Sequence, residues 1–227
     1  MRVSVLIVTY NRAAYICDAI ESVLTQSYRD FEIVVVDDGS TDKTEQIVSR
    51  YPAVQYIYQP HTGIPCARNR ALAEARGELI AWLDSDDRYA PEKLERQVTW
   101  LDAHPECKII FCRMHCFSAI PRQEMTVRQK TISDADNGSK INMVSACLYK
   151  ELYERYGTYD ESYEYSEDME FYIRLKVCGV DTSQCIDDPL YYRRIHDTNI
   201  SCHDPVSGGQ YLGIYSNAIR NAKKRGL

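Results

Sequence analysis

Residues 79–87 have the sequence Leu79-Ile80-Ala81-Trp82-Leu83-Asp84-Ser85-Asp86-Asp87, an apolar run that ends abruptly in carboxylates. The apolar part predicts a buried strand, and in α/β folds ligands bind beyond the carboxyl ends of the strands. Two Asp residues that flank one residue suit a hard divalent cation, which prefers oxygen ligands and often shares them with substrate phosphates. A polar turn after a strand would be the simpler explanation for an isolated Asp-x-Asp. The choice between a polar turn and a cation site therefore depends on the rest of the chain.

Strand-like and helix-like segments alternate before this stretch. The expected strands are Val3–Thr9, Phe31–Val36, Val54–Tyr58 and Leu79–Leu83, and the expected helices are Ala13–Gln26, Asp42–Arg50 and Pro65–Arg76. Apolar β-branched runs indicate strands that are buried on both faces, whereas apolar residues three and four apart indicate helices. The alternation therefore predicts an α/β fold with a mostly parallel, Rossmann-like central sheet that is flanked by helices.

The pattern is less regular after Asp87. We expect helices at Pro91–His104, Met143–Tyr156, Ser166–Cys178 (with Ser166 as its cap) and Gly209–Arg225, strands at Lys108–Phe117 and Asp187–Arg194, and a mobile polar loop at Ser118–Lys140. The sequence has no internal repeat and no linker rich in Gly, Pro or Ser. It therefore predicts that residues 1–227 form a single domain.

The composition excludes several classes of protein. The formal net charge of −6 argues against nucleic acid as a partner, because a general polyanion binder needs a basic surface. No run of about 18 apolar residues is present, which predicts that no segment spans a membrane. No apolar leader precedes the first expected strand, so we expect a cytoplasmic protein with reduced thiols.

Polar clusters follow three of the expected strands, namely Thr9-Tyr10-Asn11, Asp37-Asp38-Gly39-Ser40 and Asp84-Ser85-Asp86. In a parallel sheet these strand ends lie along one edge. There Tyr10 can pack against a base, Asp38 can accept hydrogen bonds from a base or ribose, and Arg68 can face a phosphate. Neither Gly-x-Gly-x-x-Gly nor Gly-Lys-Ser/Thr is present, so a nucleotide would be held by its base, its ribose and a metal-bridged diphosphate. This requirement predicts a nucleotide-sugar site.

Six motifs occur in order along the chain: Val5-Leu6-Ile7-Val8-Thr9-Tyr10-Asn11-Arg12; Val35-Val36-Asp37-Asp38-Gly39-Ser40-Thr41-Asp42; Gly63 with Ala67-Arg68-Asn69; Leu83-Asp84-Ser85-Asp86-Asp87; Glu167-Asp168-Met169-Glu170-Phe171, preceded by Gly157-Thr158-Tyr159-Asp160-Glu161; and Tyr192-Arg193-Arg194-Ile195-His196 with Ser201. In order and spacing they resemble those of family 2 glycosyltransferases with the GT-A fold. The resemblance spans about Val3 to Ser201. It implies a nucleotide-sugar-binding half at about residues 1–88, an acceptor half at about 89–205, and a C-terminal helix at 206–227.

The resemblance also implies a role for each matching residue. Binding of the nucleotide sugar is implied for Thr9, Tyr10, Asn11, Asp38, Arg68, Asp84 and Ser85, with Asp38 facing the uracil. Asp86 would bind Mg²⁺ or Mn²⁺, and His196 would be a second metal ligand or a diphosphate contact. Asp168 would be the catalytic base, with Glu167 as its rival; a carboxylate that only favours the helix start is the alternative role for Asp168.

The activity implied by the resemblance is inverting transfer of a sugar from a nucleotide diphosphate sugar, in the first place a UDP-sugar, to an acceptor hydroxyl. The acceptor would be a glycan, a lipid-linked molecule or a protein, in surface glycan or polysaccharide synthesis. The sequence lacks Gln-x-x-Arg-Trp, which favours a single transfer per encounter over processive synthesis. The alternative function is a non-catalytic module that binds a nucleotide sugar or docks a partner enzyme.

The last expected helix carries apolar residues near helical period and ends with Lys223, Lys224 and Arg225. Packing of the apolar stripe on the domain is the favoured interpretation, since basic residues are also favourable at a helix C-terminus. The alternative is peripheral contact with an anionic membrane surface, at the inner face of the membrane.

Overall fold

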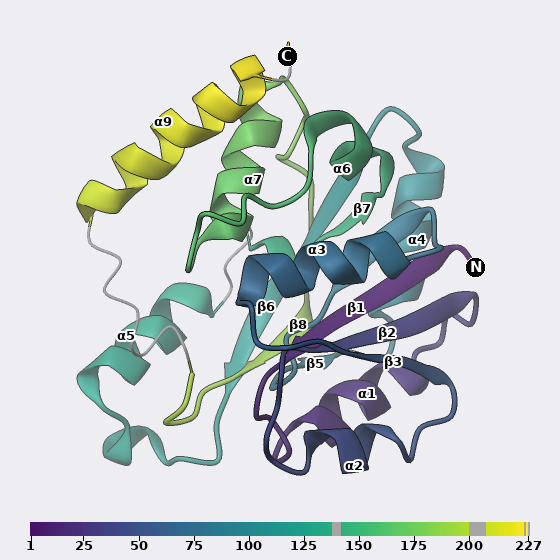
Figure 1. Cartoon of the computed structure of the whole chain (residues 1–227), viewed down its shortest axis with the longest axis vertical. Coiled ribbons are helices and arrows are strands. Elements are labelled where there is room, and N and C mark those ends of the chain that lie inside the picture. Colours follow the sequence, from purple (N-terminus) through teal and green to yellow (C-terminus); the bar gives the residue numbers. More distant parts are fainter. Residues whose placement is uncertain (138–141, 200–207, 225, 227) are drawn as a thin grey trace.

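The computed structural model describes residues 1–137, 142–199, 208–224 and 226 of the chain. Within these residues, helices cover both faces of one central sheet of eight strands (Figure 1). Ser201, Arg225 and residues 138–140 of the expected loop lie outside the described residues.

The strands are β1 (Val3–Thr9), β2 (Phe31–Asp37), β3 (Val54–Tyr58), β4 (Leu79–Trp82), β5 (Arg88–Tyr89), β6 (Ile109–Phe117), β7 (Cys147–Tyr149) and β8 (Cys185–Arg194). Their order in the sheet is β3-β2-β1-β4-β7-β6-β8-β5. The pairs β3-β2, β2-β1, β1-β4 and β6-β8 are parallel, whereas β7 is antiparallel to both of its neighbours and β5 is antiparallel to β8. The predicted α/β fold with a mostly parallel sheet is confirmed.

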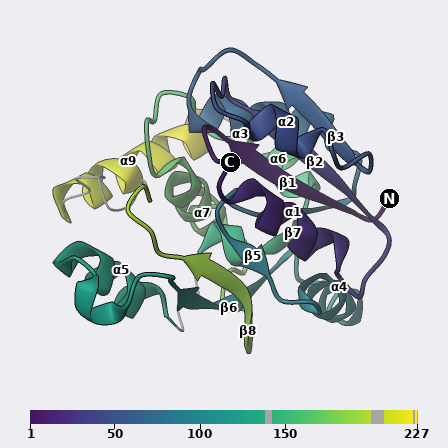
Figure 2. The same cartoon turned by 90° about the horizontal axis from the view of Figure 1, so that it is seen from below.

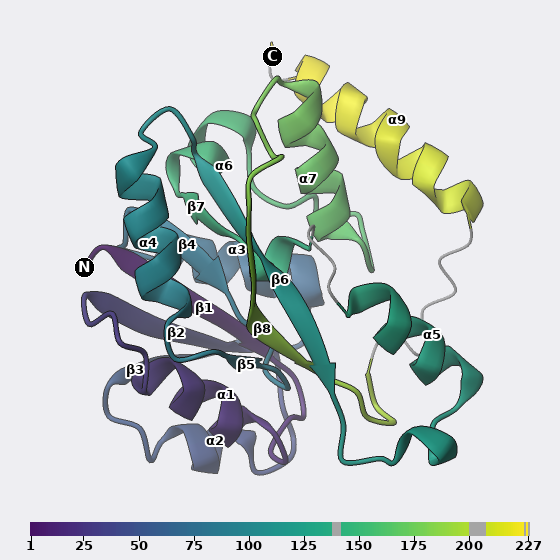
Figure 3. The ribbon, with the colours of Figure 1, turned by 180° about the vertical axis from the view of Figure 1, so that it is seen from behind.

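The helices are α1 (Ile16–Leu24), α2 (Thr44–Val48), α3 (Ile64–Glu74), α4 (Lys93–Ala103), α5 (Val127–Asp136), α6 (Glu151–Tyr156), α7 (Glu167–Val177) and α9 (Gly208–Lys224), with 3₁₀ turns at Arg122–Glu124 and Met143–Ser145. α3 packs on β1 and β2 at the front of Figure 1, and α1 and α4 lie on the face that Figure 3 turns toward the viewer. With helices on both faces, β1 and β2 are buried almost along their whole length, as their continuous apolar runs predict.

The prediction of one helix over Met143–Tyr156 is wrong in its first part. There the chain forms a 3₁₀ turn and then β7, and α6 begins only at Glu151. Cys147 and Leu148 are completely buried, because β7 fills the gap in the sheet between β4 and β6. A short apolar run does not distinguish a buried strand from a helix, and here the pairing partners far away in the chain decide.

The prediction of a polar loop over Ser118–Lys140 is wrong for Val127–Asp136, which form α5. A capping box begins this helix, since Thr126 Oγ1 accepts a hydrogen bond from Gln129 N and Thr126 N donates to Gln129 Oε1. Gln129 is buried and also donates to Asp197 Oδ1 at 3.0 Å. Because α5 is largely polar, an apolar period does not indicate this helix. The Thr-x-x-Gln sequence of the capping box is the feature that indicates it.

α9 lies against α7 (Figure 1, Figure 2). Its residues Ile214, Ala218 and Ala222 are buried, whereas Tyr215 is 51% exposed. The apolar side of the described part of α9 therefore packs on the domain, which was the favoured interpretation. No helix in the described ranges is both long and apolar enough to cross a membrane.

Candidate active site

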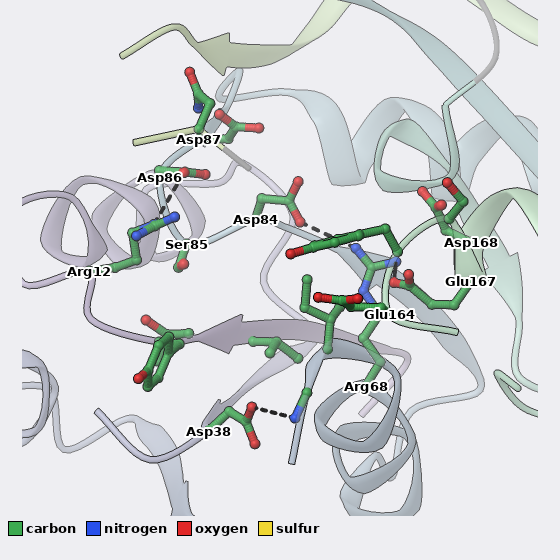
Figure 4. Close-up of a pocket in the computed structure, with 18 of the residues that line it drawn as sticks. Arg12, Asp38, Arg68, Asp84, Ser85, Asp86, Asp87, Glu164, Glu167 and Asp168 are labelled. Carbon is green, nitrogen blue, oxygen red and sulfur yellow. Dashed lines mark hydrogen bonds and ion pairs between the residues drawn. The ribbon is translucent and has the colours of Figure 1, made fainter. Parts of the chain in front are cut away.

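A cavity of about 540 Å³ lies at the carboxyl ends of β1, β2 and β4, and residues at the start of α7 line its other side (Figure 4). Most of the predicted site residues line it: Thr9, Tyr10, Asp38, Arg68, Asp84, Ser85, Asp86 and Asp168. The structure thus brings together residues from the first motif to the fifth. Asn11 and His196 are not among the lining residues.

Asn11 shapes the cavity without lining it. Its backbone has φ of 52°, a left-handed conformation that Asn tolerates better than most residues. Its N–H donates to Ser40 Oγ and its Oδ1 accepts from Thr41 N, both at 2.8 Å. These bonds tie the loop after β1 to the loop after β2, so the structure places Asn11 in a supporting position.

The three carboxylates after β4 have different surroundings. Asp87 is buried, and its side chain accepts hydrogen bonds from Tyr191 Oη at 2.8 Å and from Arg194 N at 2.7 Å. Burial, together with the charges of Asp86 and Asp84, holds the pKa of Asp87 well above its usual range. Asp87 therefore anchors the turn to β8, and Asp84 and Asp86 are left facing the cavity.

Asp86 lies between two basic side chains. Its Oδ2 is 3.0 Å from His196 Nε2 and 3.4 Å from Arg12 Nε. Burial acts to raise the pKa of Asp86, but the hydrogen bond with His196 and the charge of Arg12 outweigh it, so the pKa lies below its usual value. The ring of His196 is held in turn by a stack on Tyr15 and by Thr198 Oγ1, which is 3.0 Å from Nδ1. Asp86 is therefore an ionised carboxylate at neutral pH.

Asp86 and His196 fit a cation site that a substrate would complete. An oxygen and a ring nitrogen approach each other there, 3.0 Å apart. Thr198 N donates to His196 Nδ1 at 3.2 Å, which places the ring proton on Nε2, and a bound cation would replace that proton. The described residues contain no group of three or more His, Cys, Asp or Glu side chains that could hold a metal ion. Mg²⁺ is commonly bound by one or two carboxylates together with substrate phosphates and water. The donor set thus fits a shared site and not an all-protein cage.

Arg68, from α3, connects the two sides of the cavity. One guanidinium nitrogen, Nη2, lies 3.4 Å from Asp84 Oδ1, and Nη1 lies 3.1 Å from Glu167 Oε1 (Figure 4). The guanidinium also lies over the rings of Trp82 and Tyr159, at 5.3 and 5.6 Å from their centroids. Arg68 therefore contacts carboxylates and aromatic rings in this structure, and it also lines the predicted donor site.

Glu167 and Asp168 begin α7, but only Asp168 lines the cavity as an accessible carboxylate. The Glu167 side chain is 4% exposed, and burial raises its pKa to about 7 against the opposing charge of Arg68. Asp168 Oδ1 accepts a hydrogen bond from Met169 N at 2.7 Å. The prediction that Ser166 caps this helix is wrong: Ser166 has φ of 68° and its side chain makes no cap hydrogen bond.

Asp38 is the buried carboxylate at the β2 end of the cavity. Its Oδ1 accepts hydrogen bonds from Gln59 Nε2 at 2.7 Å and Thr62 N at 3.0 Å, and its Oδ2 accepts one from Gly63 N at 2.9 Å. His61 Nδ1 lies 2.8 Å from Oδ2. Asp38 therefore fixes the loop that leads into α3, in addition to lining the cavity.

Sequence reasoning missed several residues of the cavity, including Arg12, His61, Glu164, Tyr165, Arg193 and Asn199. Arg12 closes the first motif and Arg193 lies in the last, so motif position could have found both. His61 follows no motif residue directly. Its place depends on the approach of the loop after β3 to Asp38, which the sequence does not reveal.

Comparison with known proteins agrees with this geometry. The chain matches the family model for glycosyl transferase family 2 over residues 4–166. The chain belongs to glycosyl transferase family 2. An uncharacterized glycosyltransferase of Rickettsia prowazekii is 31% identical to it over 233 residues, which cover 98% of this chain and 73% of the rickettsial protein. Family membership supports a glycosyltransferase function for this family 2 protein.

Two solved structures share its fold. S. aureus TarS 1–349 in complex with UDP-GlcNAc has a TM-score of 0.77 at 23% identity, covering 97% of this chain and 66% of that chain. The mannosyltransferase PcManGT from Pyrobaculum calidifontis, in complex with GDP-Man and Mn²⁺, has a TM-score of 0.67 at 22% identity, covering 99% of this chain and 73% of that chain. At these identities the likeness establishes the fold alone, and it is the GT-A fold that the motifs predict. The family 2 chain spans 66% to 73% of the length of these three proteins.

Proposed function

We propose that this family 2 protein transfers a sugar from a nucleotide diphosphate sugar, in the first place a UDP-sugar, to an acceptor hydroxyl with inversion at the anomeric carbon. The observation that carries the proposal is one cavity with an ionised Asp86 on one side and Asp168 on the other. The bound UDP-GlcNAc of TarS and the bound GDP-Man of PcManGT support a nucleotide-sugar donor.

The chain's own residues would do most of the donor binding. Tyr10 would supply an aromatic ring to the base, and Asp38 would supply carboxylate oxygens at the same end of the cavity. Thr9 Oγ1 is buried beside the cavity and has no hydrogen-bond partner among the described residues, which suits a ligand that supplies one. Asp84 and Ser85 lie farther along, where the ribose and the sugar would follow.

Asp168 would act as the base. As the acceptor oxygen forms its bond to the anomeric carbon and the bond to the diphosphate oxygen breaks, Asp168 would take the proton from the acceptor hydroxyl. Attack on the face opposite the leaving group inverts the anomeric centre, so an α-linked donor would give a β-linked product. Glu167 and Arg68 would hold the start of α7 in place for this step.

A divalent cation would be held by Asp86 and His196. When bound, Mg²⁺ or Mn²⁺ would stabilise the charge that develops on the diphosphate leaving group. The Mn²⁺ in the PcManGT complex supports this part of the proposal. The acceptor, whether glycan, lipid-linked molecule or protein, and a role in surface polysaccharide synthesis at the cytoplasmic side of a membrane remain parts of the proposal that follow from the family resemblance.

A donor screen tests the proposed function. UDP-, GDP- and dTDP-sugars are added with Mn²⁺, and the melting temperature is followed, because a ligand that binds the folded state raises it according to affinity. We expect the largest rise with a UDP-sugar, and slow release of UDP in Mn²⁺ would separate an enzyme from a non-catalytic binding module. The absence of any shift with all three donors would contradict a nucleotide-sugar site.

A further inference from the structure

One contact inside the cavity has no part in the transfer described above. The Tyr10 side chain, which follows β1, is 42% exposed, and the imidazole of His61 is stacked on it. The ring centroids are 4.3 Å apart and the ring planes meet at 20°. Both residues line the cavity. The aromatic face that suits a nucleobase is therefore already covered by a planar ring of this chain.

The same imidazole also blocks the carboxylate beside it. His61 Nδ1 lies 2.8 Å from Asp38 Oδ2 and 3.0 Å from the Asp38 carbonyl oxygen. The Asp38 side chain is only 3% exposed, whereas that of His61 is 56% exposed. A ligand can therefore reach Oδ2 only by replacing a group that contacts it, and His61 is the accessible one.

The other donor to Asp38 Oδ2 is less easily replaced, because Gly63 N, at 2.9 Å, is a backbone group at the entry to α3. The Gln59 side chain and Thr62 donate to the other oxygen, Oδ1. The backbone of His61 passes close to Gly39, where an added Cβ would lie 2.7 Å from His61 N. The imidazole, by contrast, can leave Asp38 and Tyr10 by rotation about its own side-chain bonds.

We propose that the His61 imidazole occupies the place that the donor nucleobase would take and is displaced when the base binds. The inference rests on the proposed function, since it requires a nucleotide donor. His61 supplies a flat ring to Tyr10 and places a ring nitrogen at Asp38, and a base with a ring N–H supplies the same two contacts. His61 thereby lowers the affinity for every nucleotide, because its own contacts must break first.

The displaced contact also sets which bases are accepted. Uracil and guanine carry a ring N–H on the edge that would face Asp38, and this N–H can donate to the vacated Oδ2. Neutral cytosine and adenine carry a ring nitrogen lone pair there, which the carboxylate repels. Displacement of His61 therefore exposes an acceptor, Asp38 Oδ2, that favours bases with a ring N–H.

Calorimetric titration of the full chain with UDP and Mg²⁺ tests the displacement. We expect His61→Ala to bind UDP roughly 2- to 10-fold more tightly than the unmodified protein, which corresponds to the loss of one competing hydrogen bond and its stack. Inorganic pyrophosphate, which has no base, should bind equally well to both proteins. CDP should bind more weakly than UDP to both.

His104→Ala is a matched control. His104 is stacked on Trp100 with ring centroids 4.1 Å apart and planes at 15°, and its Nδ1 is 2.8 Å from Trp100 O. It does not line the cavity, so its removal should leave the UDP affinity unchanged. UDP binding to His61→Ala that is equal to or weaker than that of the unmodified protein would overturn the displacement. An equal gain for pyrophosphate would overturn the assignment to the base. If neither protein bound UDP or GDP at all, the proposed function would fall, and this inference with it.

Discussion

The two acidic clusters on opposite sides of the cavity differ in the protonation that their surroundings favour (Figure 4). At Asp86, burial acts to raise the pKa, but His196 and Arg12 outweigh it and the pKa lies below its usual value. At the start of α7, burial raises the pKa of Glu167 to about 7, although Arg68 opposes it. Asp86 therefore keeps its negative charge at neutral pH, whereas Glu167 can hold a proton.

The pKa values of Asp86 and Glu167 shift in opposite directions because different numbers of basic side chains lie beside them. Asp86 lies beside two basic side chains, those of Arg12 and His196. The buried Arg68, by contrast, is shared between Asp84 and Glu167. Glu167 is buried, and a guanidinium that it shares with Asp84 does not fully compensate that burial. Carboxylates that look alike in the sequence thus differ in their charge at neutral pH, and the charge of Asp86 fits the cation proposed for the β4 side.

The largest expected effect concerns the α7 side. Asp168→Asn should lower the rate of sugar transfer by about 10²- to 10⁴-fold, because the amide cannot accept the proton of the acceptor hydroxyl. The donor affinity should stay the same, since the change is nearly isosteric and lies away from Asp86. Initial rates at saturating donor, together with a calorimetric dissociation constant, measure both quantities. An active Asp168→Asn beside an inactive Glu167→Gln would show that the neighbouring carboxylate is the base.

The next effect concerns the β4 side. Asp86→Asn should weaken the binding of UDP in Mn²⁺ by about 10- to 100-fold, since the cation loses its carboxylate ligand and the diphosphate loses the cation. In the presence of a chelator, the variant and the unmodified protein should bind UDP equally. Titration under both conditions gives the comparison. Unmodified protein that binds UDP equally well with and without metal would rule out a role for the cation in binding.

A smaller effect is expected on stability. The pKa of Glu167 is about 7 in the folded protein, against 4.5 for an ordinary Glu. Between these values the unfolded chain has lost this proton and the folded chain keeps it, so Glu167 lowers the free energy of unfolding as pH rises from about 4.5 to 7. Glu167→Gln should remove this loss, on the order of 2 kcal/mol, and should therefore gain relative stability at pH 8 compared with pH 5. Urea denaturation of both proteins at the two pH values measures the gain; a difference that does not change with pH would contradict it.

The sequence predicted the β4 side better than the α7 side, for a physical reason. Strands β1 to β4 are separated by short helices, and their apolar runs and polar ends are local features. The pairing of β7 between β4 and β6, and the bridge from Arg68 to Glu167, depend on residues that are far apart in the chain. Local pattern could therefore place Asp84 and Asp86 at a strand end, but it could not show that Arg68 serves both clusters.

Backbone conformation is a second feature of the site that the sequence did not predict. Asn11 and Ser166 have positive φ values that the sequence motifs do not predict. Asn11 does not line the cavity, and Ser166 does not make the predicted cap hydrogen bond. The motif order nonetheless brought Thr9, Asp38 and Asp168 into one cavity. Spacing along the chain predicts which residues meet, whereas the partners that each carboxylate finds there decide its charge.

The smallest expected effect concerns the contacts of α9 with the α7 side of the cavity. Asn221 of α9 donates through Nδ2 to Asp160 Oδ2 at 3.0 Å and to Glu170 Oε1 at 3.1 Å, and so holds α7 and the segment that leads into it. Glu170 is completely buried and pairs with Arg174 at 2.7 Å. Among the described residues, α9 packs chiefly on α7.

Asn221→Ala should therefore lower the free energy of unfolding by about 1 kcal/mol, because a buried carboxylate oxygen loses a hydrogen bond. The affinity for UDP should stay unchanged, since the β4 side is supported by the sheet and not by α9. Tyr215→Ala is the control in the same helix: its side chain is half exposed, and its removal should cost less than 0.5 kcal/mol. Denaturant titration gives the stabilities and calorimetry gives the affinity for UDP. A loss of UDP affinity in Asn221→Ala would show that α9 supports both sides of the cavity. The two acidic clusters would then depend on the same helix for their support.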